Sequence, residues 1–173
     1  MQRVAIIGPC GAGKSMLAVR LGPILGLPVI HLDAEHWLPG WTEPPQPQWR
    51  EKNRRLMARE HWIIDGNYGD SMEARIIAAD TIVFLDFPRW RCVWRIIKRV
   101  MHHRGSTRPD MGKDCPERWD WEFMEYVWNY HREHRPKILD RLSRVGNGKT
   151  LFILRDQSEI DQFVKEMSSR GHS

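Results

Sequence analysis

Short apolar runs alternate with longer amphipathic stretches along most of the chain. Each of five such runs ends at or close to a glycine or an aspartate. They are Arg3–Ile7, Pro28–Leu32, Trp62–Gly66, Thr81–Leu85 and Thr150–Leu154. Apolar runs of this length, without polar alternation, are typical of strands buried on both faces. Because helical patterns separate them, we expect an α/β fold with a parallel sheet covered by helices on both sides.

The stretches between the runs predict helices. Their expected spans are 14–22, 48–60, a helix beginning at Arg89, 117–134, 136–145 and a last helix capped by Ser158. Pro23 should end or kink the first helix, and Gly26 can cap any continuation. Apolar residues share one face in two helices: Val93, Ile97 and Val100, and Ile160, Phe163, Val164 and Met167. Segments 37–48 and 105–115 predict loops, and Gly146-Asn147-Gly148 predicts a turn.

Composition fits one globular domain spanning residues 1–173, with 41% hydrophobic and 28% charged residues. No run approaches the roughly 20 apolar residues that a membrane span needs, so no membrane partner is expected. We find no pattern of a secretory signal. Three widely spaced cysteines without a CxxC pair suit a reduced compartment. We therefore expect a cytoplasmic protein.

Positive charge is concentrated in one segment. The net charge is +5, and between Arg89 and Arg108 lie seven arginines and lysines without any aspartate or glutamate. Such a patch binds anions, either nucleotide phosphates or a nucleic-acid backbone, unless it is simply a solvated helix face.

The strongest motif lies directly after the first strand and opens the first helix. It matches GxxxxGK[ST] with Gly8, Pro9, Cys10, Gly11, Ala12, Gly13, Lys14 and Ser15. Glycines let successive N–H groups point inward, and the helix N-terminus adds partial positive charge. Lys14 can reach the β- and γ-phosphates of ATP, while the Ser15 hydroxyl can bind Mg²⁺. Cys10 is either a small loop residue or a thiol whose pKa the loop lowers; we expect alkylation there that ATP blocks.

Several stretches together resemble a known family. They are the phosphate loop, His31–Asp33 with Trp37 and Trp41, Trp62–Tyr68, Phe84–Arg89 and Arg108–Gly112, and they extend the likeness from Arg3 to about Arg155. The sequence resembles adenylate-kinase-like P-loop kinases, and more closely the bacterial topology modulation family. This resemblance implies a three-layer α/β/α P-loop NTPase sandwich with a five-stranded parallel sheet. It also implies an acceptor-side segment at about 33–61 and an inserted lid at about 99–135.

The resemblance also implies roles for single residues. Arg95 and Arg99 would bind ATP from the helix after the fourth strand, Arg108 would lie on the lid, and Arg155 would join the nucleotide-binding residues. Asp65 would hold Mg²⁺ through water. Asp33 would orient the acceptor hydroxyl and take its proton. The arginines can instead be solubilising, and either carboxylate can be a plain cap or turn residue.

The acceptor side departs from adenylate kinases. Gly69 replaces an arginine that grips the acceptor phosphate in those enzymes, and Glu35-His36-Trp37 replaces a threonine–arginine pair. Arg50, Arg54 or Arg75 can hold an anionic group or lie on the surface. Among nine tryptophans, Trp37 and Trp41 are the better candidates for stacking on a ring, and packing under loops explains most others.

Two functions remain open at this point. The first is Mg-ATP-dependent phosphoryl transfer to a small-molecule or nucleotide acceptor, with the acceptor unidentified and a bare ATPase as a variant. The alternative is an ATP-binding, nucleic-acid-associated regulator of DNA topology, which the basic segment with Trp90 and Trp94 would serve. The chain lacks a recognised DNA-reading motif, so the kinase is favoured.

Overall fold

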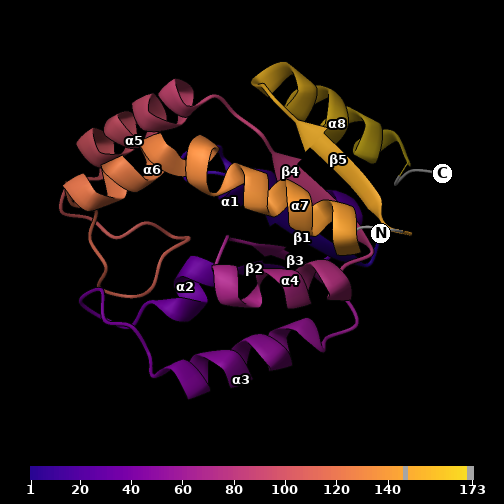
Figure 1. Cartoon of the computed structure of the whole chain (residues 1–173), viewed down its shortest axis with the longest axis horizontal. Coiled ribbons are helices and arrows are strands. Elements are labelled where there is room, and N and C mark those ends of the chain that lie inside the picture. Colours follow the sequence, from indigo (N-terminus) through magenta and orange to yellow (C-terminus); the bar gives the residue numbers. More distant parts are fainter. Residues whose placement is uncertain (146–147, 171–173) are drawn as a thin grey trace.

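In the computed structural model, which describes residues 1–145 and 148–170, five parallel strands form one open sheet. The strands are β1 Arg3–Ile7, β2 Val29–His31, β3 Trp62–Asp65, β4 Thr81–Leu85 and β5 Thr150–Leu154. Their order is β2-β3-β1-β4-β5, with β1 at the centre between β3 and β4 (Figure 1). The predicted five-stranded parallel sheet is confirmed.

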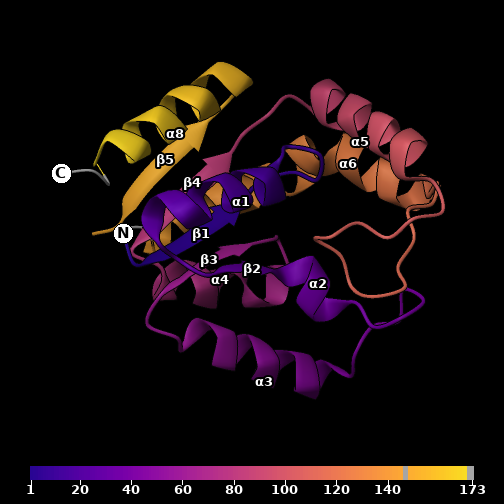
Figure 2. The same ribbon diagram turned by 180° about the vertical axis from the view of Figure 1, so that it is seen from behind.

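Helices cover both faces of this sheet. They are α1 Lys14–Leu25, α2 Leu32–His36, α3 Gln46–Met57, α4 Gly69–Ala78, α5 Arg89–His103, α6 Trp121–Glu133, α7 Arg135–Val145 and α8 Gln157–Arg170. Alternate β1 residues point to opposite sides: Val4 and Ile6 pack in the core under α1, α5 and α8, and Ala5 and Ile7 in the core under α3, α4 and α7. Figure 2 shows α1 in front of the sheet, on the face opposite α4 and α7. No helix of the described residues could cross a membrane.

Predictions about two helix ends can be compared with the structure. Pro23 does not end α1, which continues to Leu25, so Pro23 lies in the last turn. Gly26, in the left-handed conformation, caps the helix as expected. Ser158 does not cap α8; Asp156 does, accepting a hydrogen bond from the Glu159 N–H at 3.0 Å.

The buried face of α5 also differs from the prediction. Cys92, Ile96 and Val100 form it, and Val93 and Ile97 are only half-buried. The helix is rotated because its backbone abuts the phosphate loop at Cys92: a Cβ at Gly11 would lie 2.5 Å from the Cys92 carbonyl oxygen. The buried stripe predicted for α8 is confirmed.

Other differences concern where elements begin. β2 stops at His31, so Asp33 lies in the short helix α2 and not at a strand end. The sequence pattern did not predict α4. Helix α6 begins at Trp121 and not at residue 117, because the Asp120 side chain caps it by accepting from the Phe123 N–H at 3.0 Å. Of the predicted turn 146–148, residues 146 and 147 lie outside the described part of the chain.

Arg75 on α4 is neither a surface residue nor an anion ligand. It is fully buried, and burial lowers its pKa to about 10. Its guanidinium donates to the carbonyls of Gly66 (2.9 Å) and Asn67 (2.6 Å) and to the Ser71 hydroxyl (3.0 Å). Arg75 therefore fixes the backbone that follows β3.

We expect Arg75→Met to destabilise the protein by about 2–4 kcal/mol, because buried carbonyl groups lose their donor. Chemical denaturation measures this loss. Arg54→Met is the matched control, since Arg54 is exposed and, among the described residues, pairs only with Glu51 of its own helix. It should barely move the transition. Equal midpoints for the two variants would contradict the role assigned to Arg75.

Candidate active site

The phosphate loop has a backbone that only glycine tolerates at its critical positions. Gly8, Gly11 and Gly13 have φ values of 141°, 81° and 98°. At Gly8 a side chain would also collide with the carbonyl oxygen of Leu85 on β4. Gly13 is the N-cap of α1, so the loop runs directly into a helix N-terminus. This is the curled loop that the motif predicts.

Donors converge on this loop. In the first turn of α1, the Leu17 N–H donates to the Gly13 carbonyl at 3.0 Å. Helix geometry directs the N–H groups before Leu17 out of the helix end. The Lys14 ammonium lies over the loop and donates to the carbonyls of Gly8 and Pro9, each at 3.0 Å. Asn67 accepts from the Gly8 N–H at 3.2 Å and so fastens the loop to the chain after β3. The cradle suits a polyphosphate.

A cavity of about 1070 Å³ opens beside the loop. That is about the upper end of the 300–1,000 Å³ usual for ligand pockets. The predicted site residues that line it are Cys10, Gly11, Ala12, Gly13, Lys14, Ser15, Asp33, Asp65, Arg95, Arg99 and Arg108. The structure thus brings together residues from four separate segments of the chain. Gly8 and Pro9 are not among the lining residues.

Arg155 is not brought to this cavity. It follows β5 and borders a separate shallow depression, and its backbone N–H donates to Glu159 at 2.7 Å. The expected contribution of Arg155 to nucleotide binding therefore finds no support in its position.

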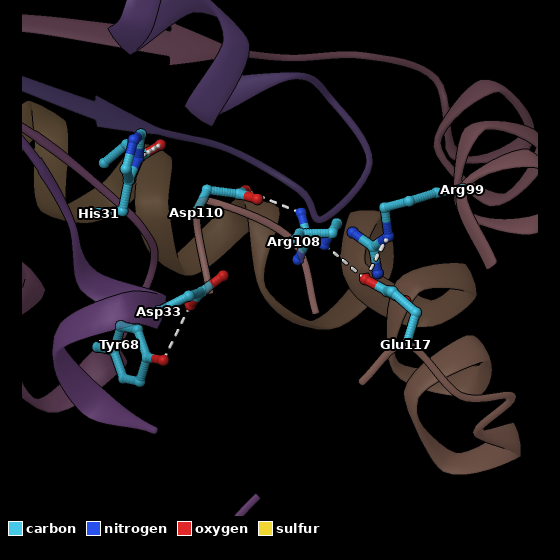
Figure 3. Close-up of polar contacts among 8 residues, drawn as sticks. His31, Asp33, Tyr68, Arg99, Arg108, Asp110 and Glu117 are labelled. Carbon is cyan, nitrogen blue, oxygen red and sulfur yellow. Dashed lines mark hydrogen bonds and ion pairs between the residues drawn. The ribbon is translucent and has the colours of Figure 1, made fainter. Parts of the chain in front are cut away.

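Three arginines of the basic segment reach the cavity. Arg95 donates to the Ala12 carbonyl and to Gln157, each at 2.9 Å, so it braces the phosphate loop from α5. Arg99 and Arg108 point from opposite sides toward Glu117 (Figure 3). Their Nε atoms lie 3.0 Å and 2.6 Å from Glu117 Oε1, as ion pairs whose N–H bonds are not well aligned with that oxygen.

Glu117 is a cavity residue that the sequence reasoning missed. It is buried, and it pairs with one arginine of α5 and one of the predicted lid. Arg108 also pairs with Asp110 at 2.8 Å. Burial, and next the charge of Arg108, lower the pKa of Arg99. No local pattern around Glu117 marks it, because both arginines come from elsewhere in the chain.

Two carboxylates lie across the cavity from this cluster. The Tyr68 hydroxyl donates to Asp33 Oδ1 at 2.9 Å, and burial, followed by the Asp33 charge, raises the pKa of Tyr68, which keeps the phenol protonated (Figure 3). Asp65 is buried at the end of β3, 3.1 Å from Nδ1 of His31 on β2. That contact raises the pKa of His31.

The predicted lid loop contacts the predicted acceptor-side segment. Gly40 N–H donates to the Asp114 carbonyl at 3.0 Å, and the Trp41 indole N–H donates to the Pro116 carbonyl at 3.1 Å. Gly112 packs against the Trp37 carbonyl so tightly that a side chain would have no room. The two segments lie side by side in both views (Figures 1 and 2). The cavity is therefore covered on the acceptor side.

The positions of the tryptophans follow the prediction only in part. Trp37 and Trp41 both line the cavity, with ring centroids 5.3 Å apart in an edge-to-face arrangement. Trp119 from the lid also lines it. Trp49 and Trp62 pack in the core. The prediction that packing explains most of the other tryptophans is wrong, because five are exposed: Trp90, Trp94, Trp119, Trp121 and Trp128.

Cys10 does not have the lowered pKa that its position at a helix N-terminus suggested. Burial raises its pKa, more than the charge of Lys14 lowers it, although part of the residue borders the cavity. Cys92 is similar, with its pKa raised by burial to about 11. The thiol of Cys10 is therefore protonated at neutral pH.

We expect Cys10 to react slowly with iodoacetamide at pH 7, and faster as the pH rises past 9.0, its ordinary value, because only the thiolate attacks. Saturating ATP should slow this reaction. Mass spectrometry of the Cys10 peptide measures it, and Cys10→Ser corrects for Cys92 and Cys115. A rate that levels off near neutral pH would contradict the raised pKa.

Comparisons with known proteins identify the fold. No protein-family model and no curated protein matches the sequence. Shikimate kinase from Acinetobacter baumannii, in complex with shikimate, is similar with a TM-score of 0.64 at 14% identity, covering 96% of this chain and 90% of that one. Shikimate kinase from Bacteroides thetaiotaomicron gives 0.52 at 16% identity, covering 99% of both chains. A gluconokinase from Sinorhizobium meliloti gives 0.53 at 16% identity, covering 99% and 91%.

The fold is that of a P-loop NTPase. The predicted three-layer architecture with its five-stranded parallel sheet is thereby confirmed. The resemblance to P-loop kinases of the adenylate-kinase-like fold holds at the level of fold. Membership of the topology modulation family stays a prediction.

Proposed function

We propose that this protein transfers the γ-phosphoryl group of ATP, in the presence of Mg²⁺, to a hydroxyl group of a small molecule. One observation carries the proposal: the phosphate loop and Asp33 line the same cavity, which Arg95, Arg99 and Arg108 also line. A carboxylate opposite a phosphate cradle is what an in-line transfer to an alcohol requires. The fold shared with kinases supports it.

Each residue has a defined task in this proposal. Lys14 and the N–H groups of the loop bind the β- and γ-phosphates, and Arg99 and Arg108 balance the charge that spreads over the transferred group. Asp33 accepts the proton of the acceptor hydroxyl, and Tyr68 holds the carboxylate in place. The covering lid keeps water out and so limits hydrolysis.

The side chains at the cavity also fit Mg²⁺. The Ser15 hydroxyl at the start of α1 and the buried Asp65 carboxylate are oxygen ligands of the kind this ion prefers. No group of three or more metal-binding side chains occurs among residues 1–145 and 148–170, which agrees with an ion that phosphate oxygens also bind. When bound, Mg²⁺ neutralises phosphate charge and orients the γ-phosphoryl group.

Nucleic-acid binding has less support. Arg95, Arg99 and Arg108 point into the cavity, so the basic segment presents fewer charges outward than its sequence suggests. Trp90 and Trp94 are exposed, and of the basic segment Arg89 and Lys98 remain exposed near them. The phosphotransferase is therefore the function we propose.

An ADP-release assay tests the proposal. Calorimetry first measures binding of Mg-ATP, and a coupled assay then screens nucleosides, nucleoside monophosphates, sugars and hydroxy acids. We expect ADP release that depends on an acceptor and produces a phosphorylated acceptor visible by mass spectrometry. ATP binding without any acceptor-dependent release would leave only an ATPase and overturn the proposal.

A further inference from the structure

We propose that the phosphoryl acceptor is an uncharged ring compound with hydroxyl groups, such as a sugar or a nucleoside, and not an acid or a phosphate ester. This inference rests on the proposed function, because it concerns the acceptor end of the same cavity. It differs from what the shikimate-bound neighbour holds, since shikimate is a carboxylate.

Free positive charge is scarce at the acceptor end. The three arginines that the sequence offered as anion ligands lie elsewhere: Arg75 is buried against backbone carbonyls, Arg54 pairs with Glu51, and Arg50 is exposed outside the cavity lining. Lys52 from the same helix pairs with Glu35 at 2.7 Å. The acceptor-side helix α3 therefore supplies no cation to the cavity from its described side chains.

The lid arginines are already neutralised. Arg99 and Arg108 share Glu117, and Arg108 also pairs with Asp110, so two positive charges face two negative ones (Figure 3). If ATP displaces Glu117 or Asp110 from these arginines, the positive charge that is freed binds the phosphates of ATP. An anionic acceptor would need a further cation.

Among the described residues, no arginine, lysine or histidine forms a hydrogen bond or ion pair with the Asp33 carboxylate. Its partner in the described structure is the neutral Tyr68 hydroxyl, and Glu43, a second carboxylate, borders the same cavity. A carboxylate or phosphate held within about 6 Å of Asp33 would be weakened by one to two powers of ten through like-charge repulsion. A hydroxyl group, in contrast, can donate a hydrogen bond to the free Asp33 oxygen.

The remaining walls suit a ring. Trp37 and Trp41 present aromatic surfaces to the cavity, and the buried Met111 lines the same cavity. Flat apolar faces next to a carboxylate match a sugar or nucleoside, whose C–H faces pack on the indoles while its hydroxyls donate. Arg118 is exposed, and its guanidinium lies 5.7 Å from the Trp41 ring centre. It is the cation to test as a ligand for an anionic acceptor.

Binding of matched pairs tests the inference without relying on turnover. Calorimetry with Mg²⁺ and a non-hydrolysable ATP analogue compares shikimate with its methyl ester, gluconate with glucose, and AMP with adenosine. We expect the neutral member to bind at least about tenfold more tightly in every pair that shows binding. Binding of glucose without adenosine indicates a sugar acceptor, and binding of adenosine without glucose indicates a nucleoside.

Two variants locate the cause. Asp33→Asn removes the negative charge with little change of shape, so we expect the preference for the neutral member to shrink about tenfold. Arg118→Ala should leave the preference unchanged. Tighter binding of the anionic members, a stronger preference for the neutral members in Arg118→Ala, or no binding of any neutral member would overturn the inference. ATP-analogue binding together with neutral-ligand binding but no ADP release would instead overturn the proposed function alone.

Discussion

Lys14→Ala is expected to lower acceptor-dependent ADP formation about 10²–10³-fold while leaving the protein folded. The Lys14 ammonium lies directly on the phosphate cradle, and in the described structure it contacts loop carbonyls, not a carboxylate. It is therefore free to move onto phosphate oxygens, and an electrostatic donor aimed at transition-state charge contributes about this much.

The loss should appear mainly in kcat, because the charge that Lys14 meets grows during transfer. Steady-state kinetics with ATP and an accepted substrate measures it, and thermal denaturation checks folding. Lys165→Ala, on the exposed face of α8, is the matched control and should leave kcat and KM unchanged. A Lys14→Ala enzyme with more than a tenth of the original kcat would contradict this role.

The phosphate loop could be predicted from the sequence because all of its determinants are local. Gly8, Gly11 and Gly13 supply the positive φ values, β1 leads in and α1 leads out within one contiguous stretch. The same reasoning located the strands, since each is short, apolar and bounded by residues that break strands. Neither result needed knowledge of distant contacts.

The features that the sequence did not reveal depend on contacts between distant segments. Glu117 gains its role only when Arg99 and Arg108 converge on it. Arg75 looks like any helix arginine until the carbonyls of Gly66 and Asn67 are seen to surround it. Each is a buried charge whose partners lie elsewhere in the chain.

Helix ends were misjudged for a different reason. Ser158 and Asp156 are both capping residues, and which of them caps α8 depends on where β5 releases the chain. Asp33 was expected at a strand end, but β2 stops two residues earlier and α2 carries the carboxylate instead. Its placement in the cavity agrees with the expectation although the element is different.

Asp33→Asn is expected to lower the rate of phosphoryl transfer about 10²–10⁴-fold and to leave ATP binding nearly intact. The amide keeps the size of the side chain and can still accept from the Tyr68 hydroxyl, but it cannot take the proton of the acceptor. The defect should therefore lie in kcat with the acceptor, while calorimetry with Mg-ATP is almost unchanged.

Two further variants separate proton transfer from positioning. Tyr68→Phe removes the hydrogen bond to Asp33 Oδ1 and should cost far less than Asp33→Asn, because the base is retained and only its orientation is loosened. Asp70→Asn changes an exposed carboxylate in the first turn of α4 and should leave the kinetics unchanged. If Asp33→Asn kept more than a tenth of the original kcat, the proton of the acceptor would have to leave by another route, and Asp33 would be a binding residue alone.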